Sequence, residues 1–403
     1  MFGVHALACP MKFEFATATR IIFGPGTFRD IGALTAELGK RALVVTGRDV
    51  SRAATLLAAL RDAGVGAVTF AVAGEPEIFT VENGVALGRK ENCEFVVGFG
   101  GGSAMDAAKA IAAMLANGGD LLDYLEIIGR GKPLMKPSVP FIAIPTTAGT
   151  GSEVTRNAVL ASPEHGLKVS LRSPFMLAKI ALVDPELTRD LPPAITARTG
   201  MDALTQLIEP FVCLRANPMT DGLCVEGLCR AARSLRIAFH DGQNKSARED
   251  MALASLFGGL ALANAGLGAV HGFAGPIGGI FPNAPHGAIC AALLPHVMRT
   301  NIRAIRRRDG QSLAERQLRP TALERYDRIA RICTGDEHAT ADAGVDWVRR
   351  LVDELQIPRL GTYGIKSEHV DELVRKATQA SSMKANPVVL SPEELAETLR
   401  AAL

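Results

Sequence analysis

The chain has 403 residues, of which 48% are hydrophobic and 21% are charged. This is ordinary globular composition, and the length is too great for one compact core, so we expect two domains. The 44 Lys and Arg residues nearly balance the 42 Asp and Glu residues. A net charge of +2 excludes the strong field that would hold nucleic acid or an anionic membrane surface.

The cysteines and the first residues indicate a reducing compartment. Seven Cys residues form neither a paired metal-binding motif nor a dense disulfide framework. The first ten residues, MFGVHALACP, lack the basic region that opens a signal peptide. We therefore expect a cytoplasmic protein, and we interpret Cys213, Cys224, Cys229 and Cys290 as small core residues.

Two kinds of segment alternate from residue 12 to about residue 185. A strand-like KFEFAT stretch comes first. Short β-branched runs then alternate with Ala- and Leu-rich amphipathic stretches, in the order RALVVTG, SRAATLLAALRDAG, GAVTFAV, a helix over Val81–Glu91, CEFVVGFGGG and a helix from Ser103. Such alternation is typical of βα units, so the sequence predicts an α/β domain with a parallel, Rossmann-like sheet.

The second half has a different pattern. Strand-like runs disappear after about Leu191, and Ala- and Leu-rich helices broken by Gly and Pro follow. The join is punctuated by Pro185, Pro192 and Pro193. The sequence therefore predicts an α/β domain over residues 12–188 and an all-α domain over residues 189–403.

One stretch of the second half, Met251–Met298, contains no Lys, Arg, Asp or Glu. It is long enough to span a bilayer. It also contains several His and Asn residues and is rich in Gly and Pro, and such residues are unfavourable in a helix that faces lipid. We expect buried helices interrupted by a Gly/Pro loop, and no membrane or nucleic-acid partner.

Two glycine-rich loops follow apolar strands in the first half. In FVVGFGGGSAMDAAKA, residues 95–110, three glycines lead from a strand into a helix at Ser103. Such a turn directs backbone N–H groups at a phosphate, although a tight turn also needs glycine without any ligand. The second loop, AIPTTAGTGSEVT at residues 143–155, gathers small hydroxyl residues. Two loops at strand carboxyl ends favour a nucleotide site, but neither loop is a Walker A or Gly-x-Gly-x-x-Gly motif.

These loops resemble the nucleotide-binding half of the iron-containing (group III) alcohol dehydrogenase family. The likeness continues in order through FGPG, SPFMLAKIALVDPEL, TGMDAL, PHG and LLPHVMR to NP near the end of the chain. It implies an α/β dinucleotide-binding domain, a helical domain and an active site in the cleft between them. It also implies an oxidoreductase that uses NAD(H) or NADP(H), assembled as a homodimer or a larger homo-oligomer.

The resemblance assigns the cofactor site to the first domain. It implies that the pyrophosphate lies around Gly100, Gly101, Gly102, Ser103 and Asp106, the nicotinamide around Thr146, Thr147 and Thr150, and the ribose beside Lys168, with Asn157 near the nicotinamide and the substrate as a catalytic candidate.

Gly47, at the end of RALVVTG, is a further cofactor-binding candidate. Family members often carry an Asp there, and an acidic residue at such a strand end binds the ribose 2′-OH and repels a 2′-phosphate. Because Arg48 follows Gly47, the repulsion is absent and a cation is close. We therefore expect NADP(H) to be accepted.

The family's metal site is only partly matched. The family uses an Asp, a His four residues later on the same helix face and two further His, a set that suits Fe(II) or Zn(II). This chain offers Asp202, His271 and His286, which are also its catalytic candidates, but Gln206 replaces the first His. An amide oxygen is a weaker metal ligand than an imidazole nitrogen. We therefore expect these four residues to bind Fe(II) or Zn(II) with weakened affinity.

Each of these residues also has a purely structural explanation. Asp202 could cap a helix that opens at about residue 200, and His271 and His286 could be core histidines. Three matched residues in so apolar a segment still favour a polar active-site cluster, because unpaired polar groups there would cost a few kcal/mol each. A further family His is replaced by Gly275, which removes a candidate proton relay and widens the pocket.

The combination favours an NAD(P)-dependent alcohol dehydrogenase or carbonyl reductase. It would transfer hydride between the cofactor and a small alcohol, aldehyde or ketone, with the carbonyl polarised by a divalent metal. A metal-independent reductase of an oxo acid, similar to the maleylacetate reductase branch of the superfamily, stays open. A lyase or synthase related to dehydroquinate synthase shares the implied fold but fits the motifs less well. A nucleotide-binding pseudoenzyme is the alternative from another class.

Overall fold

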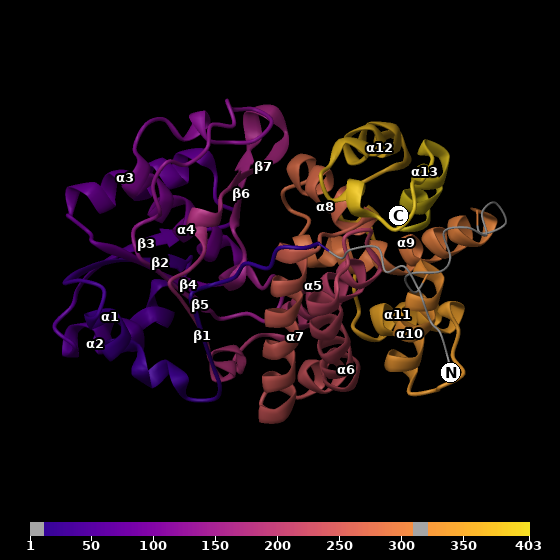
Figure 1. Cartoon of the computed structure of the whole chain (residues 1–403), viewed down its shortest axis with the longest axis horizontal. Coiled ribbons are helices and arrows are strands. Elements are labelled where there is room, and N and C mark those ends of the chain that lie inside the picture. Colours follow the sequence, from indigo (N-terminus) through magenta and orange to yellow (C-terminus); the bar gives the residue numbers. More distant parts are fainter. Residues whose placement is uncertain (1–11, 309–320) are drawn as a thin grey trace, which may run out of the picture.

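The structure, a computed structural model, describes residues 12–308 and 321–403. The stretch MFGVHALACP, which we expect not to be a signal peptide, lies outside the described residues. Figure 1 shows two parts side by side, one built around a sheet and the other helical. The predicted fold class, an α/β region followed by a helical one, is confirmed.

Six strands form one sheet in the order β1-β8-β5-β4-β2-β3, and every neighbouring pair is parallel. The order reverses between β2 and β4, which is where an open α/β sheet leaves a crevice at its carboxyl edge. The runs RALVVTG, GAVTFAV and FIAIP are strands, as predicted. The strands are β1 Arg20–Phe23, β2 Arg41–Gly47, β3 Gly66–Val72, β4 Phe95–Gly100, β5 Phe141–Pro145 and β8 Ile180–Val183.

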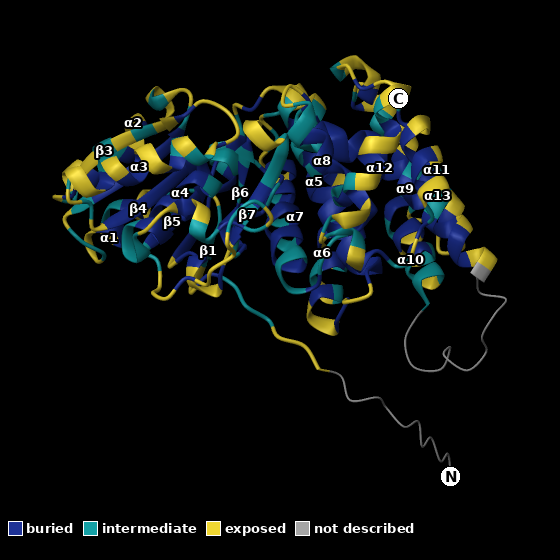
Figure 2. Cartoon of the chain, turned by 90° about the horizontal axis from the view of Figure 1, so that it is seen from above, coloured by how far each residue is buried: buried dark blue, intermediate teal, exposed yellow. Residues whose placement is uncertain are grey.

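Helices cover both faces of this sheet. Successive strand residues point to opposite sides, so strands that are apolar throughout present two apolar faces that must be buried. On β4, Val96 packs in a core with α3 and α4, whereas Val97 packs in another with α1 and α2. Figure 2 shows the central strands as a buried layer between the helices. These helices are α1 Ile31–Ala36, α2 Ala54–Asp62, α3 Ile78–Lys90 and α4 Gly102–Asn117.

Two details differ from the sequence-based expectation. The KFEFAT stretch, residues 12–17, is not a strand. Its backbone pairs with a side chain instead: the Asn264 carboxamide accepts from the Ala16 N–H at 2.6 Å and donates to the Ala16 carbonyl at 3.0 Å. The second difference is an unpredicted antiparallel hairpin, formed by β6 Asn157–Ser162 and β7 Leu167–Arg172.

The helical part follows β8, and no strand comes after Val183 in the described residues. Pro193 opens α5, where the missing N–H costs no intrahelical hydrogen bond. A capping box between Asn217 and Thr220 opens α6. The helices are α5 Pro193–Val212, α6 Pro218–His240, α7 Lys245–Asn264, α8 Ala269–Ile280, α9 His286–Arg308, α10 Ala322–Thr334, α11 Ala341–Glu354, α12 Val370–Gln379 and α13 Pro392–Ala401.

The charge-free stretch Met251–Met298 runs through the centre of this part. It forms the second half of α7, all of α8 and the first half of α9, with breaks at residues 265–268 and 281–285. Most of its apolar side chains are buried in one core. Among the described residues, no single helix has the length and apolar character of a membrane span; only α7 and α8 together, bent by 95°, pass that test.

Candidate active site between the sheet and the helical part

The two glycine-rich loops lie against each other at the carboxyl ends of β4 and β5. The Thr146 N–H donates to the Gly100 carbonyl at 2.8 Å. A Cβ atom on Gly101 would lie 3.3 Å from Thr147 Oγ1, which is closer than side chains normally pack. A side chain on Gly101 would therefore push the loops apart.

The N-terminus of α4 opens directly from the first loop. The helix begins at Gly102, and Ser103 lies in its first turn. A Cβ atom on Gly102 would lie 3.0 Å from the Thr150 methyl carbon, so the second loop closes over this helix end. The first N–H groups of a helix have no intrahelical partner and carry the positive end of its dipole. This place suits an anion.

Gly47 lies at the sheet's crevice, where β2 and β4 run side by side. Its N atom is 3.4 Å from the position of a Cβ atom on Gly100. A Cβ atom on Gly47 would meet none of the described atoms within 4 Å. The neighbouring Arg48 guanidinium donates to the Ala73 carbonyl at 3.0 and 3.3 Å. The crevice is therefore open beside Gly47 and has a cation at its edge.

Lys109, which the sequence analysis missed, joins α4 to the second loop. Its ammonium, 1% exposed, donates to the Ser152 carbonyl at 3.0 Å, to the Ser152 hydroxyl at 2.7 Å and to the Thr155 hydroxyl at 2.8 Å. Asp106 accepts from the Ser152 hydroxyl at 2.7 Å and pairs with Lys109 at 3.2 Å. Burial lowers the pKa of the Lys109 ammonium, and Asp106 opposes that shift. Asp106 therefore holds the loop.

The β6–β7 hairpin carries the remaining cofactor candidates toward the helical part. Lys168 on β7 forms an ion pair with Glu75, and its ammonium lies against Gly278 of α8. Asn157 opens β6 opposite Arg172, and its carbonyl accepts from Lys109. Residues implied to contact the ribose and the nicotinamide thus lie on one hairpin that reaches α8.

The second loop also touches the helical part with its backbone. A Cβ atom on Gly149 would lie 2.8 Å from Thr199 Cβ on α5. One on Gly151 would lie 2.5 Å from Gly259 Cα on α7. Gly151 has a φ of 57°, which also favours glycine. This close contact sets the glycine-rich loops directly beside α5 and α7.

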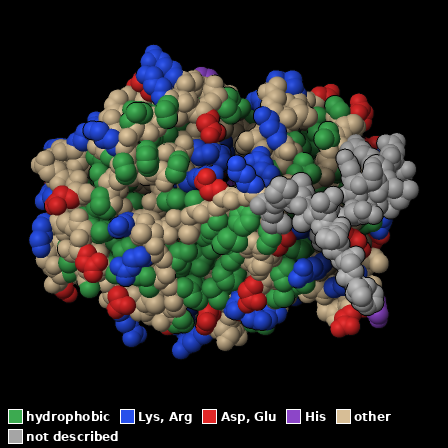
Figure 3. Space-filling view, viewed as in Figure 1, with side chains coloured by type: hydrophobic (Ala, Val, Ile, Leu, Met, Phe, Trp, Pro, Cys, Tyr) green, Lys and Arg blue, Asp and Glu red, His purple; other side chains and the backbone are tan. Residues whose placement is uncertain are grey.

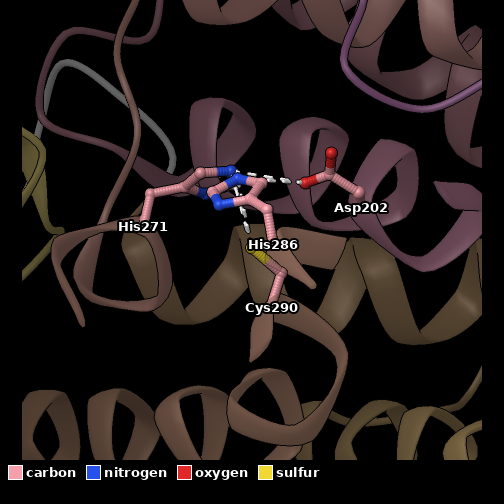
Figure 4. Close-up of side chains that lie close together, drawn as sticks. All are labelled: Asp202, His271, His286 and Cys290. Carbon is pink, nitrogen blue, oxygen red and sulfur yellow. Dashed lines mark hydrogen bonds and ion pairs between the residues drawn. The ribbon is translucent and has the colours of Figure 1, made fainter. Parts of the chain in front are cut away.

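A buried polar cluster lies in the helical part (Figure 4). Asp202 comes from α5, His271 from α8 and His286 from the start of α9. Asp202 Oδ1 is 3.6 Å from His271 Nε2 and 3.7 Å from His286 Nε2. The side chains of Asp202 and His271 are 3% and 7% exposed, whereas that of His286 is 34% exposed. The three residues singled out in the sequence are thus brought together, with one imidazole open to the outside.

The oxygens of this cluster fit a cation. Asp202 Oδ1 and Gln206 Oε1 are buried and have no hydrogen-bond partner among the described residues. Asp202 is not a helix cap as its structural explanation supposed, because α5 begins at Pro193. Buried oxygens are rarely left unpaired. A carboxylate, an amide oxygen and two imidazoles form a donor set that suits a divalent metal.

Glu209 orients one of the imidazoles, and the sequence analysis missed it. Its Oε2 accepts from His271 Nδ1 at 2.7 Å, and its Oε1 accepts from the Val270 N–H at 2.7 Å. Because Nδ1 donates to Glu209, His271 presents Nε2 to Asp202. Glu209 comes seven residues after Asp202, on the same face of α5, and that spacing in an apolar helix was the available signal.

Cys290 completes the cluster, so its interpretation as a plain core residue is incomplete. It lies one helical turn after His286 on α9 and is fully buried. Its Sγ is 3.7 Å from His286 Nε2 and 3.8 Å from His271 Nε2. Burial raises the pKa of its thiol to about 11. Its position therefore combines the burial of a core residue with contacts to both histidines.

Burial and neighbouring charges shift the pKa values of the cluster residues in opposite directions. Burial lowers the pKa of His286 to about 4, helped by His271 and Lys168 and opposed by Asp202. Burial also acts to raise the pKa of Asp202, but the two histidines outweigh it and the pKa is lowered. Burial also acts to lower the pKa of His271, but Cys290, Asp202 and Glu209 outweigh it and raise that pKa well above its usual value. At neutral pH the cluster therefore holds an anionic Asp202 and a neutral His286, and a bound metal would displace a proton from His271.

Comparison with known proteins identifies the family. Residues 18–185 match the family model described as iron-containing alcohol dehydrogenase, and residues 196–403 match the model of the C-terminal part of the Fe-containing alcohol dehydrogenase family. The chain belongs to the iron-containing alcohol dehydrogenase family.

Individual proteins are similar to this chain over nearly their whole length. A choline dehydrogenase from Bacillus subtilis (strain 168) is 35% identical over 93% of this chain and 92% of its own. A crystal structure of 1,3-propanediol oxidoreductase has a TM-score of 0.88 at 34% identity, covering 98% of this chain and 100% of its own. The structure of a sulfoacetaldehyde reductase from Bifidobacterium kashiwanohense in complex with NAD+ has a TM-score of 0.83 at 30% identity. The match covers 98% of this chain and 99% of that chain.

This member of the iron-containing alcohol dehydrogenase family is an oxidoreductase. It transfers hydride between a nicotinamide cofactor and the alcohol or carbonyl group of a small molecule. Gln206 lies on α5 one turn after Asp202, and Gly275 lies on α8 one turn after His271. A Cβ atom on Gly275 would meet none of the described atoms within 4 Å, so this side of α8 is open.

Proposed function

We propose that the chain is a metal-dependent alcohol dehydrogenase that works mainly as a reductase of small aldehydes or ketones. The observation that carries this proposal is the buried Asp202 oxygen, which has no hydrogen bond among the described residues and lies 3.6 and 3.7 Å from two imidazole nitrogens. Asp202, His271 and His286 would supply three ligands to a divalent metal, and either Gln206 or Cys290 would supply the fourth.

The chain's own residues prepare the site for this reaction. When bound, Fe(II) or Zn(II) acts as a Lewis acid toward a carbonyl oxygen, and NAD(P)H supplies the hydride. Glu209 holds His271 in one tautomer, and the buried walls keep Asp202 away from bulk water. The open space beside Gly275 would admit the substrate. With no histidine at this position, we propose that the product oxygen takes its proton from water.

The cofactor would bind between the loops and the hairpin. We assign the pyrophosphate to the N-terminus of α4, where Gly100, Gly101, Gly102 and Ser103 lie, and the nicotinamide to Thr146, Thr147, Thr150 and Asn157, with Lys168 at the ribose. Asp106 receives a positioning role, because its carboxylate binds Ser152 and Lys109 and would repel a phosphate.

We further propose that NADP(H) is accepted. The open space beside Gly47 would take a 2′-phosphate, and the Arg48 guanidinium at the edge of the crevice would favour its charge. The measurement is kcat/KM for NADH and NADPH with the wild type and with Gly47→Asp. We expect the substitution to lower kcat/KM for NADPH more than for NADH. A strong wild-type preference for NADH would overturn this assignment.

We also propose a homodimer or a larger homo-oligomer. Figure 3 shows hydrophobic side chains gathered in the middle of one face of the molecule. A contiguous apolar patch of this kind often marks a protein–protein contact. Sedimentation equilibrium of the purified chain would give a mass of at least twice 42.5 kDa. A monomer at micromolar concentration would contradict the proposal.

Chelation and add-back test the metal dependence. The enzyme is stripped of metal with a chelator and assayed with NADPH against a panel of small aldehydes, ketones and oxo acids. We expect turnover to be lost and then restored by Zn(II) or Fe(II). Asp202→Asn should prevent restoration, whereas Asp371→Asn, an exposed carboxylate on α12, should not. Full turnover of an oxo acid by the stripped enzyme would favour the metal-independent reductase.

A further inference from the structure

The strongest unassigned feature of the molecule is the thiol of Cys290. Figure 4 shows it pointing into the space shared by Asp202, His271 and His286. One ligand atom from each of these four residues lies within 4.8 Å of the other three. No other group of three or more His, Cys, Asp or Glu side chains with this arrangement was found in the described part of the chain.

The distances suit a shared ion. Metal–ligand bonds of about 2.0–2.3 Å place neighbouring ligand atoms of a tetrahedral site about 3.3–3.6 Å apart. The two Asp–His separations are 3.6 and 3.7 Å, and the two Cys–His separations are 3.7 and 3.8 Å. These four separations lie at the upper end of that range or a few tenths of an ångström above it, and the Asp–Cys and His–His separations are within 4.8 Å.

The unpaired oxygen of Asp202 is an independent sign that the space holds a ligand. Its side chain is 3% exposed, and Oδ1 has no hydrogen-bond partner in the described residues. Cys290 Sγ lies within 4.8 Å of the ligand atom of Asp202. An ion bound between them would satisfy both groups.

We propose that Cys290, in place of Gln206, is the fourth protein ligand of the divalent metal. This inference rests on the metal site of the proposed function. His286 and Cys290 lie four residues apart on one face of α9, so they reproduce on α9 the i, i+4 pair that Asp202 and Gln206 no longer form on α5. The ligand lost from one helix is thus replaced from another.

A thiolate changes the chemistry of the site. On binding, the thiol proton passes to solvent and the sulfur forms the metal bond, so one proton is released from Cys290 for each ion bound. The charges of Asp202 and the thiolate then balance those of a divalent cation. Sulfur is a soft ligand that Zn(II) binds well, whereas an amide oxygen suits harder ions. We therefore expect firm Zn(II) binding, not the weakened binding expected from Gln206.

Cobalt spectroscopy tests the assignment without any turnover assay. The full-length protein is stripped of metal and loaded with Co(II), which accepts the same ligands as Zn(II) and absorbs in the near ultraviolet when bound to a thiolate. We expect this thiolate-to-metal absorption in the wild type and in Cys224→Ala, a buried cysteine of α6 outside the cluster. It should be absent from Cys290→Ala. Its persistence in Cys290→Ala would overturn the proposal.

Competition titration of Zn(II) against a chromophoric chelator gives a second readout. Removal of a ligand should weaken Zn(II) binding in Cys290→Ala by at least about tenfold, and Gln206→Ala should change it by less than about threefold. Cys290→Ser, which keeps the size of the side chain, and circular dichroism of each variant control for folding. A larger loss in Gln206→Ala than in Cys290→Ala would overturn the assignment. Failure of the wild type to bind one equivalent of Co(II) would overturn the proposed metal dependence itself.

Discussion

The two sides of the site use different parts of the chain, backbone loops on the sheet side and ionisable side chains on the helical side. On the sheet side, glycines and small hydroxyl residues bring two backbone loops within van der Waals contact, and the buried ammonium of Lys109 holds the second loop. On the helical side, ionisable side chains from α5, α8 and α9 meet inside an apolar core. A backbone site needs residues close in sequence, whereas a side-chain site needs residues that only packing brings together.

This contrast predicts that added side-chain volume and charge in the glycine-rich loops abolish cofactor binding. Gly101→Asp would push Thr147 away and place a carboxylate against the cofactor pyrophosphate. We expect cofactor binding to be lost, with affinity reduced at least about a hundredfold, since a like charge at close range costs several kcal/mol. Titration calorimetry measures the affinity. Gly222→Asp, on an exposed position of α6, is the matched control, and unchanged affinity in Gly101→Asp would disprove the loop assignment.

The contact between the two sides should be sensitive to a single methyl group. In Gly259→Ala, the new Cβ atom would overlap the Gly151 carbonyl oxygen, and neither backbone can move without separating the loop from α7. We expect the free energy of unfolding to fall by about 2–3 kcal/mol. Gly222→Ala on α6 has open space and should gain up to about 1 kcal/mol from helix propensity. Equal urea midpoints for the two variants would contradict this view of the junction.

On the helical side, metal binding should instead depend on the orientation of the ligand side chains. Glu209→Gln keeps an acceptor for the Val270 N–H but removes the carboxylate that fixes the His271 tautomer. We expect Zn(II) affinity to fall by about ten- to a hundredfold while the fold is retained. Glu226→Gln, exposed on α6, should leave the affinity unchanged. If both variants bind Zn(II) as the wild type does, Glu209 has no positioning role.

The smallest expected effect concerns a buried acid of the sheet side. Burial raises the pKa of Glu153 to about 7, although its own backbone and Lys109 act to lower it. The folded state therefore holds the proton more tightly than the unfolded state, and stability is lost as the pH rises from about 4.5 through 7.

Glu153→Gln removes this dependence. Relative to the wild type, the variant should be more stable by about 1–3 kcal/mol at pH 8.5 and nearly equal at pH 5. Urea unfolding at the two pH values measures the difference, and Glu164→Gln on the surface is the control. A stabilisation of the same size at both pH values would show that the carboxyl pKa is not the cause.

The sequence by itself determined the parallel sheet and the two glycine-rich loops. RALVVTG and FIAIP are apolar, β-branched runs bounded by turn residues, and their conformation depends on neighbours in the chain. The resemblance to the family singled out Asp202, His271 and His286. The KFEFAT stretch has an equally strand-like pattern, but only tertiary structure decided that Asn264 takes its backbone hydrogen bonds.

Only the tertiary structure decided how the cluster is completed. Nothing in the local pattern around Cys290 distinguishes a ligand from a core cysteine, because the distinction depends on α5 and α8 lying against α9. The same holds for Glu209, whose partner His271 is 62 residues away in the chain. Local periodicity reports which face of a helix is buried, whereas the identity of the atoms met on that face depends on long-range packing.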